Sequence, residues 1–127
     1  MAVGRLLGET LQPGAIVLLT GDLGAGKTAF VRGLAESLGI DTADVSSPTF
    51  TIIQEYRGGR VLMRHVDLYR LTPREVDELG LDEMTLDPAV TAIEWPDRLP
   101  RSLGEAIHVR LAHGGGDTRT IEIERPS

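Results

Sequence analysis

The sequence contains no cysteine, a single lysine and few aromatic residues. Without cysteine there can be no disulfide framework, no thiolate metal site and no cysteine nucleophile. The longest uninterrupted apolar run, residues 15–19, is far shorter than the roughly 20 residues that span a bilayer. The start of the chain also lacks the basic and apolar regions of a signal peptide. We therefore expect a cytoplasmic protein without a membrane segment.

Acidic side chains outnumber basic ones, with 19 Asp and Glu against 13 Lys and Arg, for a formal net charge of -6. A protein that grips nucleic acid or an anionic membrane by itself needs a basic surface that displaces counterions. The charge balance argues against such a role, while leaving room for a local basic patch. Among the basic residues, twelve are arginines and one is a lysine, Lys27.

The length and composition are those of an ordinary globular protein. A chain of 127 residues with 41% hydrophobic and 25% charged residues is too apolar for intrinsic disorder and is the right size for one compact core. We expect residues 1–127 to form a single domain.

Together with the glycine-rich motif GDLGAGKT at residues 21–28, the hydrophobic pattern predicts an α/β fold of the P-loop NTPase type, with a mixed sheet, flanking helices and a C-terminal β-hairpin. Periodicity and turn signals predict a short helix in residues 1–12, a buried strand at 15–20, a helix after Gly26 that is capped by Gly39, a hairpin of 49–56 with 61–67, a helix at 72–79, a strand at 89–93, and a terminal hairpin within 107–123.

Residues 21–28 match the phosphate-loop pattern G-x-x-x-x-G-K-[ST], between the predicted buried strand and the helix that follows it. Glycines let successive N–H groups turn into one concavity, and the helix adds its positive dipole end. The alternative is a glycine-rich turn that only links strand and helix, but motif and context together favour nucleotide binding. The candidate nucleotide-binding residues are Gly21, Asp22, Leu23, Gly24, Ala25, Gly26, Lys27 and Thr28.

Two residues of this motif have distinct expected roles. The ammonium group of Lys27 would contact the β- and γ-phosphates as a compact point charge, and the hydroxyl of Thr28 would complete the coordination of Mg²⁺.

Two acidic residues at the carboxyl ends of predicted strands are candidates for magnesium binding or catalysis. Glu94 follows a strand that we expect to run parallel to the phosphate-loop strand, so both carboxyl ends face one crevice. There it would bind Mg²⁺ or orient an attacking water, and an exposed glutamate at a strand exit is the less favoured alternative. Asp67 could hold Mg²⁺ directly or through water, although an aspartate that starts a turn explains its position equally well.

Other polar and aromatic residues give weaker signals. Trp95 could cover the nucleotide, but a lone tryptophan more often packs in the core or at its rim. The loop at residues 46–49 could order around the γ-phosphate as a GTPase switch does, whereas a Ser/Thr turn is favoured if the loop is taken alone. The histidines show no metal-ligand spacing, and we assign no chemistry to His65, His108 or His113.

Four strings in this order resemble the TsaE family of bacterial ATPases. They are GDLGAGKT at residues 21–28, SPTFT at 47–51, HVDLYRL at 65–71 and EWP at 94–96. The resemblance extends from about residue 13 to residue 99, and it fades in the terminal hairpin.

The resemblance implies a small P-loop ATPase that binds ATP and Mg²⁺ and works with TsaB and TsaD to form threonylcarbamoyladenosine beside the tRNA anticodon. It implies that Thr28 and Glu94 bind magnesium, that Asp67 is an outer-sphere or catalytic carboxylate, and that Thr49 belongs to a nucleotide-sensing loop. In such a system TsaB and TsaD handle most of the tRNA contact, which agrees with the acidic charge of this chain.

Two other functions use the same phosphate loop. A small-molecule kinase is disfavoured, because the pattern offers no acceptor-binding domain or arginine-bearing lid and 127 residues leave little room for either. A nucleotide-gated binding module, in which ATP orders a loop and hydrolysis is incidental, would need no further catalytic group.

Replacing Lys27 with arginine tests whether the phosphate loop needs a lysine rather than a positive charge. We expect Lys27→Arg to fold normally but to lose ATP turnover, because a planar guanidinium is too broad for a cradle around one cluster of phosphate oxygens. Circular dichroism and phosphate release from ATP measure the two properties, and near-normal turnover would contradict the prediction.

Overall fold

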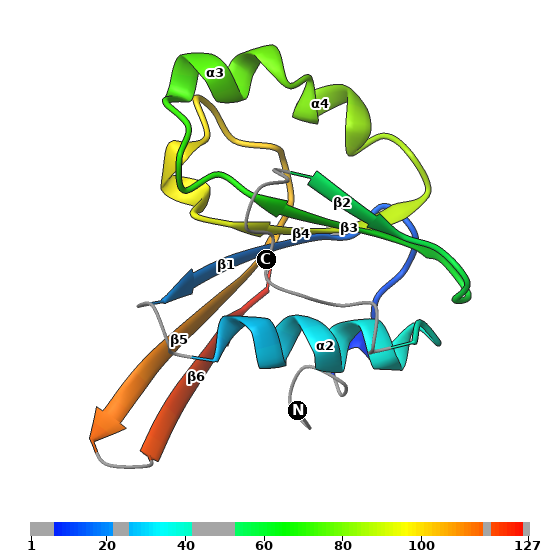
Figure 1. Ribbon diagram of the computed structural model, residues 1–127, viewed down its shortest axis with the longest axis vertical. Helices are drawn as coiled ribbons and strands as arrows, with labels where there is room; N and C mark the ends of the chain where they lie inside the picture. Colours follow the sequence, from blue (N-terminus) through cyan, green and yellow to red (C-terminus); the bar gives the residue numbers. More distant parts are fainter. Residues whose placement is uncertain (1–6, 22–25, 42–52, 116–117, 126–127) are drawn as a thin grey trace.

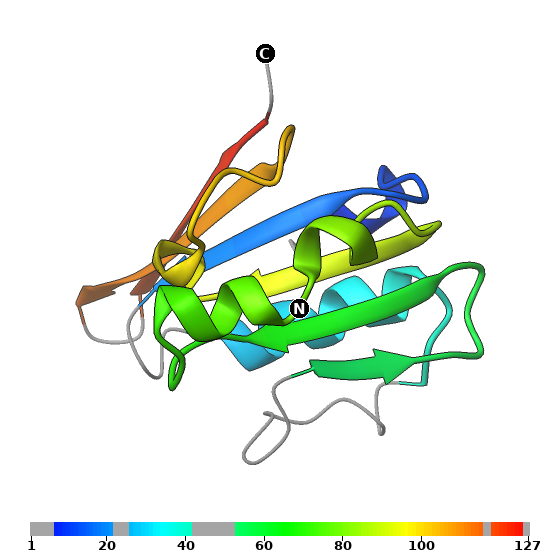
Figure 2. The same cartoon turned by 90° about the horizontal axis from the view of Figure 1, so that it is seen from above.

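The computed structural model describes residues 7–21, 26–41, 53–115 and 118–125. Within these residues, strands form a mixed sheet of order β2-β3-β4-β1-β5-β6. The strands are β1 (Ile16–Gly21), β2 (Ile53–Tyr56), β3 (Leu62–Asp67), β4 (Ala89–Glu94), β5 (Ile107–Gly115) and β6 (Thr118–Glu124). Helix α2 (Lys27–Ser37) covers one face of the sheet, and helices α3 (Pro73–Glu78) and α4 (Leu81–Met84) lie on the other (Figures 1 and 2). The predicted α/β fold with a mixed sheet and flanking helices is confirmed.

The central strands of the sheet are parallel, and their ends align. Strand β1 pairs in parallel with β4 and β5, and β3 pairs in parallel with β4, while the outer strands β2 and β6 are antiparallel to their neighbours. The register places Glu94 opposite both Leu19 on β1 and Asp67 on β3. The two carboxylates predicted from sequence therefore end adjacent strands at the same edge of the sheet.

Most predicted elements appear in the structure. The terminal hairpin is β5 with β6, and it joins the main sheet through the β1–β5 pairing. The described part of the other hairpin is β2 with β3. Of the predicted N-terminal helix, residues 7–9 are helical and the preceding residues lie outside the described part. Helix α4 was not predicted, because Gly80 ends the apolar pattern and a four-residue helix is too short to show periodicity.

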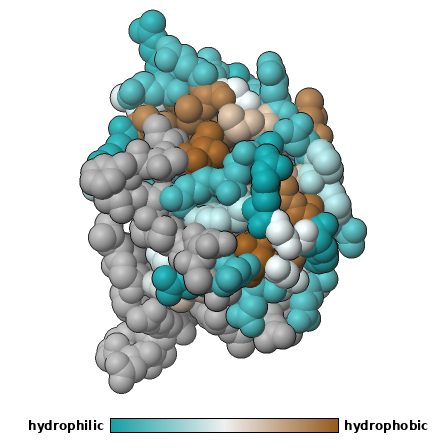
Figure 3. All heavy atoms as spheres, turned by 45° about the vertical axis from the view of Figure 1, so that its right-hand side comes forward, coloured by the Kyte–Doolittle hydropathy of each residue, from teal (hydrophilic) through white to brown (hydrophobic). Residues whose placement is uncertain are grey.

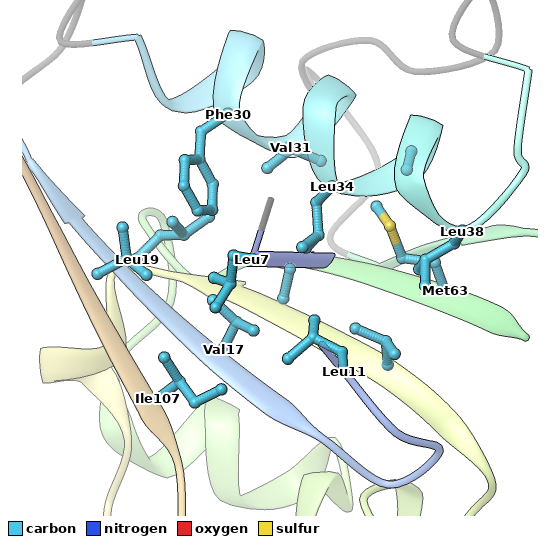
Figure 4. Close-up of a cluster of buried hydrophobic side chains, with 14 of the residues drawn as sticks. Leu7, Leu11, Val17, Leu19, Phe30, Val31, Leu34, Leu38, Met63 and Ile107 are labelled. Carbon is cyan, nitrogen blue, oxygen red and sulfur yellow. The ribbon is translucent and has the colours of Figure 1, made fainter. Parts of the chain in front are cut away.

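Helix α2 packs its apolar side on the sheet and forms the larger core. Figure 4 shows Phe30, Val31, Leu34 and Leu38 projecting from the helix toward residues of the sheet. The sheet and N-terminal residues labelled there are Leu7, Leu11, Val17, Leu19, Met63 and Ile107. Burying one large apolar side chain stabilises the folded protein by about 1.5–3 kcal/mol relative to leaving it exposed. The combined burial of these residues therefore holds α2 against the strands.

The end of α2 is capped as the sequence predicts. Gly39 has a φ of 82°, a conformation that favours glycine. Its N–H donates to the carbonyl of Glu36, and the N–H of Ile40 donates to the carbonyl of Ala35. These two bonds form a Schellman motif, which ends the helix.

Two polar residues interrupt the apolar pattern of β3, and they face opposite sides of the sheet. Arg64 is buried beneath α4, where it donates to Glu55 Oε2, to the Met84 carbonyl and to Asp87 Oδ2, each at 2.8 Å. The hydrogen bonds to Glu55 and Asp87 raise the pKa of Arg64. The hydrogen bond from Arg64 in turn lowers the pKa of Glu55. Arg64 thus joins β2, β3 and α4, while His65 points to the α2 side.

The surface carries apolar side chains in separate patches among polar ones on the face shown in Figure 3. Large apolar residues with substantial exposure include Leu86, Tyr69 and Ile123. In the described part of the chain, no helix has the length and apolar content needed to cross a bilayer.

The N-terminus of α3 supplies a test of the local structure. Thr72 Oγ1 accepts from the Glu75 N–H, and the Glu75 side chain accepts from the Thr72 N–H, which makes a capping box. We expect Thr72→Ala to lower the free energy of unfolding by about 1 kcal/mol. Urea denaturation measures this loss, and Thr85→Ala, which alters a partly buried threonine whose hydroxyl donates to the carbonyl of Asp82 at the end of α4, is the matched control. Equal effects of the two substitutions would contradict the role of the cap.

Candidate functional site

Two described glycines of the phosphate-loop motif are required by the backbone. A Cβ on Gly21 would lie 2.6 Å from the Leu111 carbonyl oxygen on the neighbouring strand β5. Gly26, the N-cap of α2, has a φ of 95° and a left-handed conformation that side chains disfavour. Asp22, Leu23, Gly24 and Ala25 lie outside the described residues, so their predicted roles stay predictions. The strand and the helix on either side are as predicted.

The N-terminus of α2 presents donors and a cation at the carboxyl end of β1. Because the N-cap is a glycine, it offers no side-chain acceptor to the first amides of the helix, which have no partner within the helix. Lys27 is the first residue of α2 and is only 9% exposed, and the partly buried Thr28 follows it. Together these groups suit an anion, because the N–H groups, the helix dipole and the ammonium all attract negative charge.

The carboxylate of Glu94 lies between a lysine and a histidine. Its Oε1 is 3.7 Å from Lys27 Nζ, and its Oε2 is 2.6 Å from His65 Nε2. All three side chains are buried, and His65 has no exposed surface. The expectation that the strand of Glu94 is parallel to the phosphate-loop strand is confirmed by the β1–β4 pairing.

Asp67 is placed beside Glu94 and also starts a turn. It ends β3 opposite Glu94, and its Oδ1 accepts from the backbone N–H of Tyr69 at 3.0 Å. The Leu68 N–H donates to the Glu94 carbonyl, which keeps the two strand ends together. The two interpretations of Asp67 from the sequence are therefore compatible, because the turn leaves the residue at the edge of the site.

Trp95 has a strained backbone and contacts Lys27. Its φ of 61° is the one positive value among the described non-glycine residues, and such a conformation costs about 1–3 kcal/mol. The ring lies 4.5 Å from Lys27 Nζ, a cation–π distance, and packs against Tyr69 with 4.8 Å between ring centroids. Trp95 therefore packs at the rim of the site and contacts its cation, and the expectation that it covers the nucleotide stays a prediction.

The polar groups at the carboxyl ends of these strands suit a magnesium ion that is bound jointly by protein and phosphate. They do not suit a metal site made of protein ligands alone. Among the described residues, no group of three His, Cys, Asp or Glu side chains could hold a metal ion. Mg²⁺ is usually held by one or two carboxylates together with substrate phosphates and waters. Glu94 and Asp67, which end paired strands, would supply the carboxylate oxygens. The hydroxyl of Thr28 would supply a further oxygen ligand.

A further predicted site residue is not among the described residues, and the sequence pattern did not identify one residue that contacts the site. Thr49 lies outside the described residues, and its role stays a prediction. His65 was assigned no chemistry, yet its side chain contacts Glu94 directly. Strand alternation places His65 on the same face as Asp67 two residues later, and that spacing is the sequence signal that could have identified it.

The family model described as "Threonylcarbamoyl adenosine biosynthesis protein TsaE" matches residues 1–121. The chain belongs to the TsaE family. The resemblance inferred from the four sequence strings is thereby confirmed, and the match also includes most of the terminal hairpin. The family's described role is in tRNA threonylcarbamoyladenosine biosynthesis.

Relatives of the TsaE family support the assignment over nearly the whole chain. A protein from Nostoc sp. named "tRNA threonylcarbamoyladenosine biosynthesis protein TsaE" is 47% identical over 125 residues, covering 95% of this chain and 76% of the relative. A protein of the same name from Bacillus subtilis is 42% identical, covering 94% of this chain and 75% of its own length. The crystal structure of YdiB from Bacillus subtilis superposes with a TM-score of 0.78 at 35% identity, covering 99% of this chain and 78% of that one.

The only tryptophan in this TsaE sequence offers an optical test of the site. Because Lys27 Nζ lies over the Trp95 ring, a polyphosphate that attracts the ammonium group would change the indole environment. We expect ATP to change the fluorescence of Trp95 in the wild-type chain and not in Lys27→Ala. If calorimetry detects ATP binding while the emission stays constant, the contact does not respond to the ligand.

Proposed function

We propose that this chain is a Mg²⁺-dependent ATPase that supports the formation of threonylcarbamoyladenosine on tRNA. The carrying observation is that Lys27 of the phosphate-loop motif and Glu94 of β4 converge, 3.7 Å apart, at the carboxyl ends of parallel strands. Such strand ends are the usual ligand sites of open α/β sheets. Membership of the TsaE family supplies the tRNA modification to which this chemistry belongs.

Each residue at the site has a definite task in ATP hydrolysis. The N–H groups at the start of α2 and the ammonium group of Lys27 hold the phosphates and balance their charge. Thr28 and Glu94 would hold Mg²⁺, with Asp67 beside them directly or through water. The ion, when bound, neutralises charge that develops on the transferred phosphoryl group. Glu94 and Asp67 are also the carboxylates that can orient an attacking water.

The ion pair between Lys27 and Glu94 gives both groups a partner before nucleotide binds. A buried charge without a partner is costly, and here each group offsets the burial of the other. Phosphates entering the site compete for Lys27, which frees one oxygen of Glu94 for the metal. In this proposal, nucleotide and magnesium together replace the internal ion pair.

We propose that the partners are TsaD and TsaB, with tRNA contacted only through them. The net charge of -6 suits a subunit that leaves tRNA binding to others, because nucleic acid binding requires a basic surface. We expect slow hydrolysis by the chain alone and faster hydrolysis in the complex, as in P-loop proteins that receive an activating group from a partner.

Phosphate release from ATP tests this function, first with the pure chain and then with TsaB, TsaD and tRNA. We expect partners to stimulate hydrolysis and Lys27→Ala to abolish it, because the variant removes the cation that binds the phosphates. Arg32→Ala is the matched control, since it removes a cation from an exposed position on the same helix. Loss of activity in both variants would point to a general effect on α2.

Two results would replace the proposal with another function. Transfer of phosphate to a small acceptor in the absence of partners would indicate a kinase. Partner binding that needs ATP, with tRNA modification intact when hydrolysis is blocked, would indicate a nucleotide-gated binding module.

A further inference from the structure

His65 is a fully buried polar side chain that neither the phosphate-loop motif nor the magnesium ligands account for. Its Nε2 is 2.6 Å from Glu94 Oε2, a short hydrogen bond between two residues that are 29 positions apart in the sequence. If His65 only filled space in the core, an apolar residue would serve there equally well. The hydrogen bond to Glu94 is a contact that an apolar residue could not make.

The strand register explains why this contact forms. His65 on β3 lies opposite Ala92 on β4, and Glu94 follows two residues later on the same face of the sheet. The small side chain of Ala92 leaves room for the imidazole to reach along β4 to the carboxylate. Both partners belong to central strands, β3 and β4, so their backbones are held by pairing on both sides.

The direction of the hydrogen bond depends on the tautomer of His65. With Glu94 as the carboxylate of the ion pair with Lys27, the carboxylate only accepts hydrogen bonds, so the Nε2–H of His65 is the donor. Among the described residues, Nδ1 has no hydrogen-bond partner. The imidazole is therefore anchored at one end, and within the described residues its polar contact is with the carboxylate of Glu94.

The two oxygens of Glu94 have different partners. Oε2 is held by His65, and Oε1 faces Lys27 at the longer distance of 3.7 Å. If nucleotide draws Lys27 away, the bond to His65 is the contact that still fixes the carboxylate. Partners of this kind, which orient a ligand without touching the metal, are common at metal sites.

We propose that His65 is a positioning residue that orients the carboxylate of Glu94 toward the magnesium and phosphates. This inference rests on the proposed ATPase function and adds to it a residue that contacts neither ligand. It assigns to Oε1 the contact with the metal and to Oε2 the contact with the protein.

Three substitutions separate orientation from packing. The amide nitrogen of glutamine can occupy the place of Nε2, whereas that of asparagine ends near the place of Nδ1. We therefore expect His65→Gln to keep Mg²⁺ binding and ATPase activity close to those of the wild type, and His65→Asn and His65→Leu to weaken both. His108→Leu, which alters a histidine on β5, is the matched control. Because the Gln and Asn variants bury similar polar groups, their comparison stays decisive even if the Leu variant unfolds.

Calorimetry with ADP, with and without Mg²⁺, supplies a readout that packing alone would not change. We expect His65→Leu and His65→Asn to bind metal-free ADP as the wild type does, and to bind Mg²⁺ roughly 10–100-fold more weakly in the presence of ADP. In steady-state assays with the partner proteins, kcat should fall to a similar extent while KM for ATP changes little.

The outcomes distinguish the two proposals. The inference is overturned if the wild type binds Mg²⁺ with ADP and hydrolyses ATP, but the folded His65→Asn variant is as active as the folded His65→Gln variant. In that case His65 only packs. If the wild type binds neither ADP nor ATP, the proposed function itself fails, and the inference fails with it.

Discussion

The parallel pairing of β4 with both β1 and β3 is the constraint on which this site depends. It places Glu94 at the end of a strand that has neighbours on both sides, with Asp67 opposite it on β3 and the phosphate-loop strand on its other side. Because β4 is paired on both edges, the backbone of Glu94 is fixed in the centre of the sheet, and the contacts of its side chain with Lys27 and His65 then determine where the carboxylate lies.

The cation reaches that carboxylate because of apolar packing elsewhere. Lys27 is the first residue of α2, and the position of the helix is determined by Phe30, Leu34 and Leu38, which are buried against the sheet. Gly21 at the end of β1 and Gly26 at the N-cap of α2 occupy backbone positions where a side chain is disfavoured. Hydrophobic burial therefore supplies the stability, and the helix end supplies the electrostatics that an anionic ligand requires.

Buried polar contacts at the site form a connected set rather than isolated pairs. Glu94 links Lys27 to His65, and Lys27 in turn lies over the ring of Trp95. Trp95, whose backbone is strained, also packs against Tyr69. Strain and buried charge are destabilising in themselves, and folds retain them at sites where function needs them.

The sequence by itself determined the family, the strand and helix that flank the phosphate-loop motif, and most other strands and helices, because motifs and hydrophobic periods are properties of neighbouring residues. It also predicted that the strand before Glu94 runs parallel to the phosphate-loop strand. It left Asp67 undecided and gave His65 no role, because pairing partners and register are set between strands that are distant in the chain. Only the tertiary structure placed Ala92 opposite His65 and so decided that the imidazole reaches Glu94.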